Sequence, residues 1–218
     1  MVESLIMLYR VTVNEKEEQL KGMQVAENQW LTLEDNELIK AYISGEFAAF
    51  ECLYNRHKGG SFRFILRQVK DSTSAEDLMQ ELWFKVVSNI RQFKGESKFT
   101  TWLYQMARNL MIDRFRHLEV VSGVIAETEA REEVASDWRQ TADTDLVQKR
   151  QKAALSRCLQ KLPKAQLESF LLKEEGNLTR SDVAQITGVS LEAAKSRLRA
   201  AYNELRTCIS RVLGENDD

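Results

Sequence analysis

The fold is decided by residues 74–116, which read SAEDLMQELWFKVVSNIRQFKGESKFTTWLYQMARNLMIDRFR. Apolar residues recur in this stretch at steps of three and four, which is the period of an α-helix with one buried face. In its first part they are Ala75, Leu78, Met79, Leu82, Trp83, Val86, Val87 and Ile90. The pattern predicts an amphipathic helix whose apolar stripe enters a hydrophobic core.

The outer face of this first helix is acidic. Its start is predicted by the tetrad SAED at residues 74–77, which has the form of a capping box. Asp77, Gln80 and Glu81 lie outside the apolar stripe at positions i, i+3 and i+4, so they share one surface. Such a patch is suited to a basic partner.

The second helix, predicted over residues 99–116, has a basic and polar outer face. Phe99, Leu103, Met106 and Leu110 form its inner stripe, and the residues expected outside are Lys98, Thr101, Tyr104, Gln105, Arg108, Asn109 and Arg116. Cations suit phosphates, amides suit base edges and an exposed ring suits stacking, so this face predicts nucleic-acid binding. The alternative is an ordinary solvated face. Between the two helices, the sequence predicts a loop that contains Lys94, Gly95, Glu96 and Ser97. This loop either takes part in nucleic-acid binding or is a plain connector.

Composition favours helices throughout. The 218 residues include one proline and nine glycines, and the formal net charge is −2. No apolar run is long enough to span a membrane and no basic leader precedes one, so we expect a cytoplasmic protein without membrane insertion. Cys52, Cys158 and Cys208 are odd in number and widely separated, which argues against a disulfide framework or a metal knuckle. No catalytic, metal or cofactor motif is present, so we expect no enzyme and no cofactor.

Five segments are predicted along the chain. Residues 1–33 form a weakly ordered extension, 34–118 a first helical domain, 119–147 an acidic linker, 148–213 a second helical domain and 214–218 a tail. The first domain is expected to open with a helix from Asp35 that stops at Gly45. Two further helices are expected before residue 70, separated at Gly59 and Gly60. The linker is either a solvated tether or a segment that runs through a channel for polyanions.

The second domain contains the pattern of a helix-turn-helix. Thr179 and Asp182 form a capping box, residues 187–189 a tight turn around Gly188, and Ser190 the cap of the next helix. The buried stripe of that helix is predicted as Leu191, Ala194, Leu198, Ala201 and Leu205, and its outward residues as Glu192, Lys195, Ser196, Arg197 and Arg199. The first turns of such a helix enter the major groove, where Lys and Arg pair with guanine.

These motifs carry a family resemblance. Residues 75–83 (AEDLMQELW), 99–103 (FTTWL) and 107–113 (ARNLMID) together resemble region 2 of the extracytoplasmic-function sigma factors, the small promoter-specificity subunits of bacterial RNA polymerase. Residues 195–199 (KSRLR) resemble the recognition helix of region 4 in the same family. The resemblance covers residues 33–118 and 148–213 and implies a two-domain, all-α transcription initiation factor.

The resemblance also implies partners and roles. Asp77, Gln80 and Glu81 would dock on the clamp of the largest polymerase subunit, and region 4 would engage the flap. The loop from Lys94 to Ser97 would hold a flipped base, the outer face of residues 98–116 would bind the minus-ten element, and the recognition helix would read the minus-thirty-five element. An anti-sigma factor is expected as well. The rival hypotheses are a helix-turn-helix regulator with a helical sensor or dimerisation domain, and a helical interaction protein without a DNA role.

Overall fold

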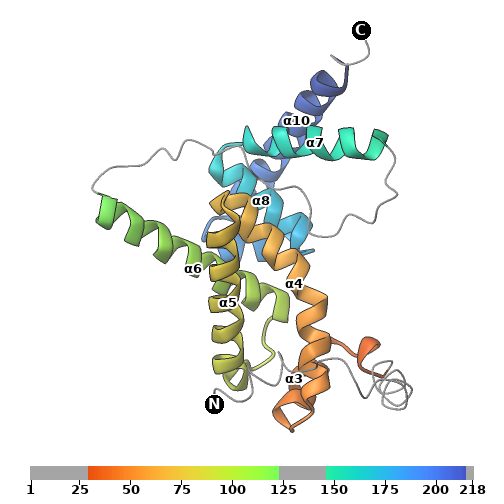
Figure 1. Ribbon diagram of the computed structural model, residues 1–218, viewed down its shortest axis with the longest axis vertical. Helices are drawn as coiled ribbons and strands as arrows, with labels where there is room; N and C mark the ends of the chain where they lie inside the picture. Colours follow the sequence, from red (N-terminus) through yellow and green to blue (C-terminus); the bar gives the residue numbers. More distant parts are fainter. Residues whose placement is uncertain (1–28, 123–145, 215–218) are drawn as a thin grey trace. The chain divides into compact units, whose positions relative to one another are not determined.

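The computed structural model describes residues 29–122 and 146–214. Within these ranges all regular structure is helical and no strand occurs, which confirms the predicted all-α class (Figure 1). The helices are α3 (Asp35–Ile43), α4 (Phe47–Val69), α5 (Ser72–Asn89), the short 3-10 helix η1 (Ile90–Gln92), α6 (Phe99–Ser122), α7 (Leu146–Gln160), α8 (Lys164–Glu175), α9 (Arg180–Thr187) and α10 (Leu191–Gly214). None of these helices is both long and apolar enough to cross a membrane.

The chain divides into two compact units, residues 1–56 and 57–218, and the division falls inside α4. Most of the predicted N-terminal extension and most of the predicted acidic linker lie outside the described residues. The five predicted segment boundaries stay a prediction.

In the first unit, α3 forms as its sequence predicts. The Glu34 amide donates to the Glu37 carboxylate at 2.9 Å, which closes the first turn. Leu38 and Ile39 are buried, and the helix ends just before Gly45, whose φ of 110° only glycine adopts without strain. The stop signal is therefore confirmed.

The helix α4 runs without interruption through Gly59 and Gly60, so the predicted break there is wrong. Glycine weakens a helix interior by about 1 kcal/mol, and the burial of Leu53, Phe64 and Ile65 on either side of the pair offsets that cost. The Ser61 hydroxyl donates to the His57 carbonyl at 2.8 Å, a bond made along the continuous helix.

The helices α5 and α6 pack against each other in the second unit (Figure 1). The helix α5 begins at Ser72, two residues earlier than the predicted capping box, because the Asp71 carboxylate accepts from the Ser74 amide at 2.7 Å. The predicted stripe is buried from Ala75 to Val86 and again at Ile90 in η1, whereas Val87 is 40% exposed and was wrongly assigned to the core. In α6, Phe99, Leu103 and Leu110 are buried as predicted, and Met106 is half-buried.

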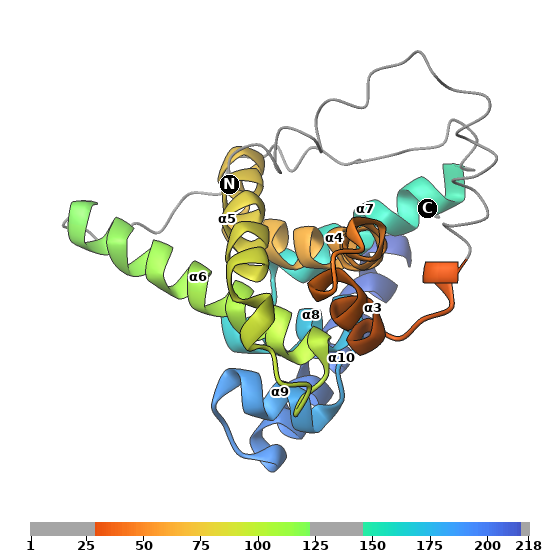
Figure 2. The same cartoon turned by 90° about the horizontal axis from the view of Figure 1, so that it is seen from below.

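The helices α8, α9 and α10 pack together as the predicted helix-turn-helix and its support (Figure 2). The capping box at the start of α9 is confirmed: the Asp182 amide donates to the Thr179 hydroxyl at 3.1 Å, and the Thr179 amide donates to the Asp182 carboxylate at 2.9 Å. Gly188 ends α9 in the left-handed conformation, with φ of 70°. The Ala193 amide then donates to the Ser190 hydroxyl at 3.2 Å, so Ser190 caps α10 as predicted.

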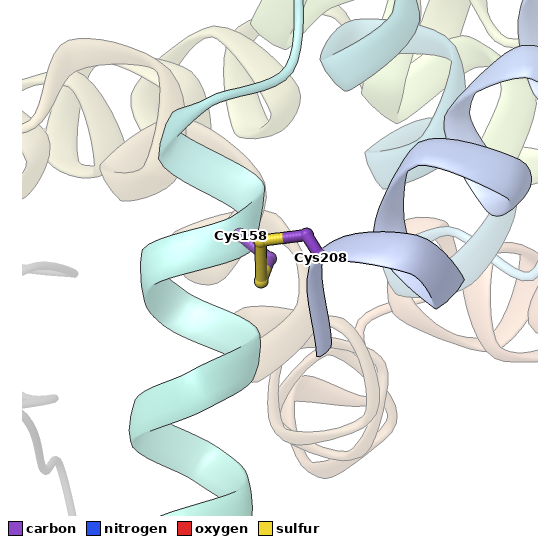
Figure 3. The surroundings of a disulfide bond; sticks show 2 residues. All are labelled: Cys158 and Cys208. Atoms are coloured by element: carbon purple, nitrogen blue, oxygen red, sulfur yellow. A yellow bond between two sulfur atoms is a disulfide. The ribbon is translucent and has the colours of Figure 1, made fainter. Parts of the chain in front are cut away.

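A disulfide joins α7 to α10 through Cys158 and Cys208, which are 50 residues apart in the sequence (Figure 3). The expectation that the cysteines are too widely separated to pair is wrong. Because α7 packs along α10, the fold brings the two residues to a Cα–Cα distance of 5.8 Å. An odd count of three allows one pair and one remaining thiol, and Cys52 is free.

Candidate nucleic-acid interface

The acidic patch on α5 has the exposure that its sequence predicts. Asp77, Gln80 and Glu81 are all exposed, and Glu81 pairs with Lys85 at 3.4 Å on the solvated surface. Phe84 lies one turn further along this face and is 61% exposed. Sequence reasoning had not assigned Phe84, although its position three residues after Glu81 places it beside the patch. The patch therefore offers carboxylates next to an apolar side chain.

The loop before α6 has an ordered aromatic base and exposed polar residues. The Phe93 ring lies 5.4 Å from the Trp102 ring and 6.0 Å from the Phe99 ring, which anchors both ends of the loop. Lys94, Gly95 and Glu96 are exposed, and Ser97 is half-buried. Gly95 has φ of 74°, so a residue with a side chain would be strained there. The loop thus presents backbone and polar groups from a fixed position.

Part of the predicted outer face of α6 is accessible. Lys98, Asn109 and Arg116 are exposed, and Gln105 and Arg108 are half-buried. The Gln105 amide donates to the Asn109 side-chain oxygen at 3.2 Å, which orients both amides. Arg108 donates to the Glu168 carboxylate at 2.9 Å, so the groups left exposed for phosphates and base edges are Lys98, Asn109 and Arg116.

Two residues of that face are buried, which corrects their predicted exposure. Thr101 is 3% exposed and Tyr104 is 2% exposed. The Tyr104 ring lies 5.1 Å from the Phe64 ring of α4, and burial raises the pKa of its hydroxyl, with the charge of Glu175 acting in the same direction. The helical period identifies one apolar stripe of α6, whereas the structure also packs Tyr104 on α4 and packs α6 on α9, which the period does not report.

The recognition helix presents its predicted polar residues. Glu192, Ser196 and Arg199 are exposed, while Lys195 and Arg197 are half-buried. The Lys195 ammonium donates to the Glu192 carboxylate at 2.7 Å, and this bond lowers the pKa of Glu192. Ala194, Leu198, Ala201 and Leu205 are buried as predicted, but Leu191 is 43% exposed and was wrongly placed in the core. Its position in the first turn of the helix leaves it at the rim of the packing.

Within residues 29–122 and 146–214, no group of three or more His, Cys, Asp or Glu side chains is arranged to hold a metal ion. The chemistry offered by these surfaces is charge, hydrogen bonding and apolar contact.

Comparisons with known proteins match two parts of the chain, one that contains α5 and one that contains the helix-turn-helix. Residues 53–119 match the family Sigma-70 region 2, and residues 152–205 match the family Sigma-70, region 4. Among the relatives, the ECF RNA polymerase sigma factor SigK of Mycobacterium tuberculosis is 26% identical over 179 residues, which cover 79% of this chain and 91% of SigK.

Two other relatives are matched over a smaller share of their length. The ECF RNA polymerase sigma factor BldN of Streptomyces coelicolor is 26% identical over 185 residues, covering 83% of this chain and 66% of BldN. The ECF RNA polymerase sigma factor SigX of Bacillus subtilis is 35% identical over 72 residues, covering 33% of this chain and 37% of SigX. The matches thus span less than two thirds of these two relatives.

Two solved structures share the fold. One is the sigma factor RpoE in complex with the anti-sigma factor NepR from Bartonella quintana, with a TM-score of 0.57, 24% identity, and coverage of 77% of this chain and 98% of that one. The other is CnrH in complex with the cytosolic domain of CnrY, with a TM-score of 0.56, 20% identity, and coverage of 84% and 98%.

Proposed function

Because this chain belongs to the extracytoplasmic-function sigma factors of bacterial RNA polymerase, we propose that it binds the polymerase core, recognises specific promoters and helps to open them. The observation that carries this proposal is the presence, in one chain, of an exposed acidic patch on α5 and a capped helix-turn-helix with a basic recognition helix. The chain supplies binding surfaces in the cytoplasm, and the polymerase supplies the catalysis.

The roles of the individual surfaces follow from this assignment. Asp77, Gln80 and Glu81 dock on the clamp of the largest subunit, and region 4 contacts the flap. The loop 94–97 and the outer face of α6 engage the minus-ten element, and α10 reads the minus-thirty-five element. The similar structure of RpoE was solved in complex with the anti-sigma factor NepR, so we include an anti-sigma factor among the partners.

Reconstitution with purified core polymerase tests the proposed function. Run-off transcription from a library of promoter fragments should depend on both the core and this chain, and the active fragments should share two sequence elements. Tight, sequence-specific duplex binding by the isolated chain, with no stimulation of the core, would favour the helix-turn-helix regulator instead.

In the recognition helix, replacement of Lys195, Arg197 or Arg199 by alanine should weaken use of the upstream element. A residue that pairs with guanine should also lose about 1–3 kcal/mol of discrimination at one base, whereas a phosphate contact should weaken all sequences equally. Transcription from promoters with single substitutions in the upstream element measures both effects.

Arg206→Ala is the matched control for these variants, because Arg206 is also exposed on α10 but lies beyond the turns that enter the groove. It should behave as the unaltered chain does. If all three variants and the control read the upstream element alike, α10 is not the recognition helix.

Exchange of residues 94–98 for the corresponding loop of a relative should change the preferred minus-ten base. Unstacking one duplex step costs on the order of 1.4 kcal/mol, and capture of one exposed base returns about 1–3 kcal/mol. A few captured bases are therefore enough to hold the strands apart. Permanganate footprinting across a promoter library measures which bases open, and core binding and upstream preference should stay unchanged. An unaltered base preference with normal opening would identify the loop as a connector.

A further inference from the structure

The start of α10 carries a carboxylate and an ammonium that are bonded to each other. The Lys195 ammonium donates to the Glu192 carboxylate at 2.7 Å. Both residues lie outside the stripe of Ala194, Leu198 and Ala201, which packs into the core. An exposed ion pair of this kind contributes little to stability, so the pair is not needed to hold the helix.

The position of the pair is set by the cap of the helix. The Ser190 hydroxyl accepts from the Ala193 amide at 3.2 Å, which fixes where α10 begins. Glu192 is therefore the second residue of the helix, and 79% of its side chain is exposed, compared with 36% for Lys195. The first turns of a recognition helix are the part that enters the major groove, so the carboxylate stands where base edges are read.

Glu192 carries its charge at neutral pH. The hydrogen bond from Lys195 and the charge of the same ammonium lower the pKa of the Glu192 carboxyl, and the charge of Arg199 acts in the same direction. An ionised carboxylate only accepts hydrogen bonds, and an ammonium only donates them. The pair therefore presents an acceptor group and a donor group side by side.

A G·C pair presents the complementary arrangement in the major groove. Its cytosine N4 donor lies beside the guanine O6 and N7 acceptors, and these are the groups that glutamate and lysine side chains contact. An A·T pair in the same orientation would set the adenine amine against the ammonium and the thymine oxygen against the carboxylate. A reversed C·G pair would also bring like groups together. A T·A pair keeps one match to each side chain but replaces guanine N7 by the thymine methyl group.

We propose that Glu192 and Lys195 together read one G·C pair of the upstream promoter element, with Glu192 accepting from cytosine N4 and Lys195 donating to guanine. The entry of α10 into this element rests on the proposed function. At other base pairs the carboxylate meets acceptors, which weakens binding there. Glu192 is therefore a specificity-determining residue.

Glu192→Gln tests this assignment, because it replaces the carboxylate by an amide of the same size. The unaltered chain should prefer cytosine over adenine at one position by about tenfold, a ratio within the range of one specific base contact. Glutamine forms a bidentate pair with adenine N6 and N7. In Glu192→Gln the preference at that position should therefore shift from cytosine to adenine.

Selection from a random duplex library, followed by sequencing of the bound fraction, measures these ratios. The full chain is used alone at low salt, where phosphate contacts strengthen binding, and again in complex with core polymerase. Relative enrichment reports base preference even when the overall affinity is low. Circular dichroism checks that each variant keeps its helices.

Two further variants define the site. Glu204→Gln makes the same chemical change at an exposed position of α10 beyond the turns that enter the groove, and it should leave every base preference unchanged. Lys195→Ala should weaken the preference for guanine at the base pair that Glu192→Gln alters. A role of Glu192 confined to the positive end of the helix dipole would affect stability and leave base preference as it is.

The outcomes separate this inference from the proposed function. A shift from cytosine to adenine, at the base pair that Lys195→Ala also affects, supports the paired readout. The inference is overturned by an unaltered chain without a cytosine preference, by unchanged preference in Glu192→Gln, or by effects of the two variants on separate base pairs. Core-dependent transcription by the unaltered chain tests the proposed function on its own, because it does not depend on which residues read the upstream element.

Discussion

Charge reversal at Asp77 and Glu81 should abolish association with the polymerase core. Both side chains are exposed on α5, opposite its buried stripe, so Asp77→Arg with Glu81→Arg should leave the helical fold intact. The change places cations against a basic partner, which costs several kcal/mol across an interface. At about 1.4 kcal/mol for each factor of ten, affinity should fall on the order of a thousandfold. Co-purification with tagged core and fluorescence titration measure the loss.

Glu51→Arg with Glu204→Arg is the control for this prediction. It changes the net charge of the chain by the same amount at two exposed positions away from the patch, on α4 and α10. It should retain core binding, which would exclude a general effect of added positive charge. Co-purification of the Asp77 and Glu81 double variant at the unaltered level would show that α5 does not carry the docking surface.

Features that depend on neighbouring residues could be predicted from the sequence. The buried stripe of α5 apart from Val87, the capping box of Thr179 and Asp182, and the tight turn at Gly188 were predicted correctly, because helical period and capping act over three or four residues. The acidic patch followed from the same period. Local patterns of this kind therefore predicted the fold class and the exposure of the acidic patch.

Features that depend on distant residues were missed. The break predicted at Gly59 and Gly60 applied a local rule for helix ends, whereas Gly60 permits close approach of residues more than forty positions away along the chain. Thr101 and Tyr104 were assigned to an exposed face because no local pattern reports the packing of α9 on α6 or of Tyr104 on Phe64 of α4. The disulfide between Cys158 and Cys208 was not predicted for the same reason: no local pattern reports the packing of α7 along α10.

Loss of the Cys158–Cys208 disulfide should strongly destabilise region 4. The bond closes a loop over a sequence separation of 50, which includes α8 and α9. Restricting an unfolded loop of this length stabilises the folded state by about 4 kcal/mol in the chain-entropy model. Cys208→Ala is preferred to a change at Cys158, since Cys158 is 1% exposed and its truncation would also leave a cavity.

Hydrogen exchange of the amides in α8, α9 and α10 measures this local stability without requiring the whole chain to unfold in one step. In Cys208→Ala, exchange limited by opening of region 4 should accelerate by up to about a thousandfold, the factor that corresponds to about 4 kcal/mol. A reducing agent should produce the same acceleration in the unaltered chain. Cys52→Ala is the control, because Cys52 is a free thiol in α4, outside the bridged loop, and its loss should leave exchange in region 4 and its response to reduction unchanged. Equal exchange in the oxidised and reduced protein would show that packing alone holds α7 against α10.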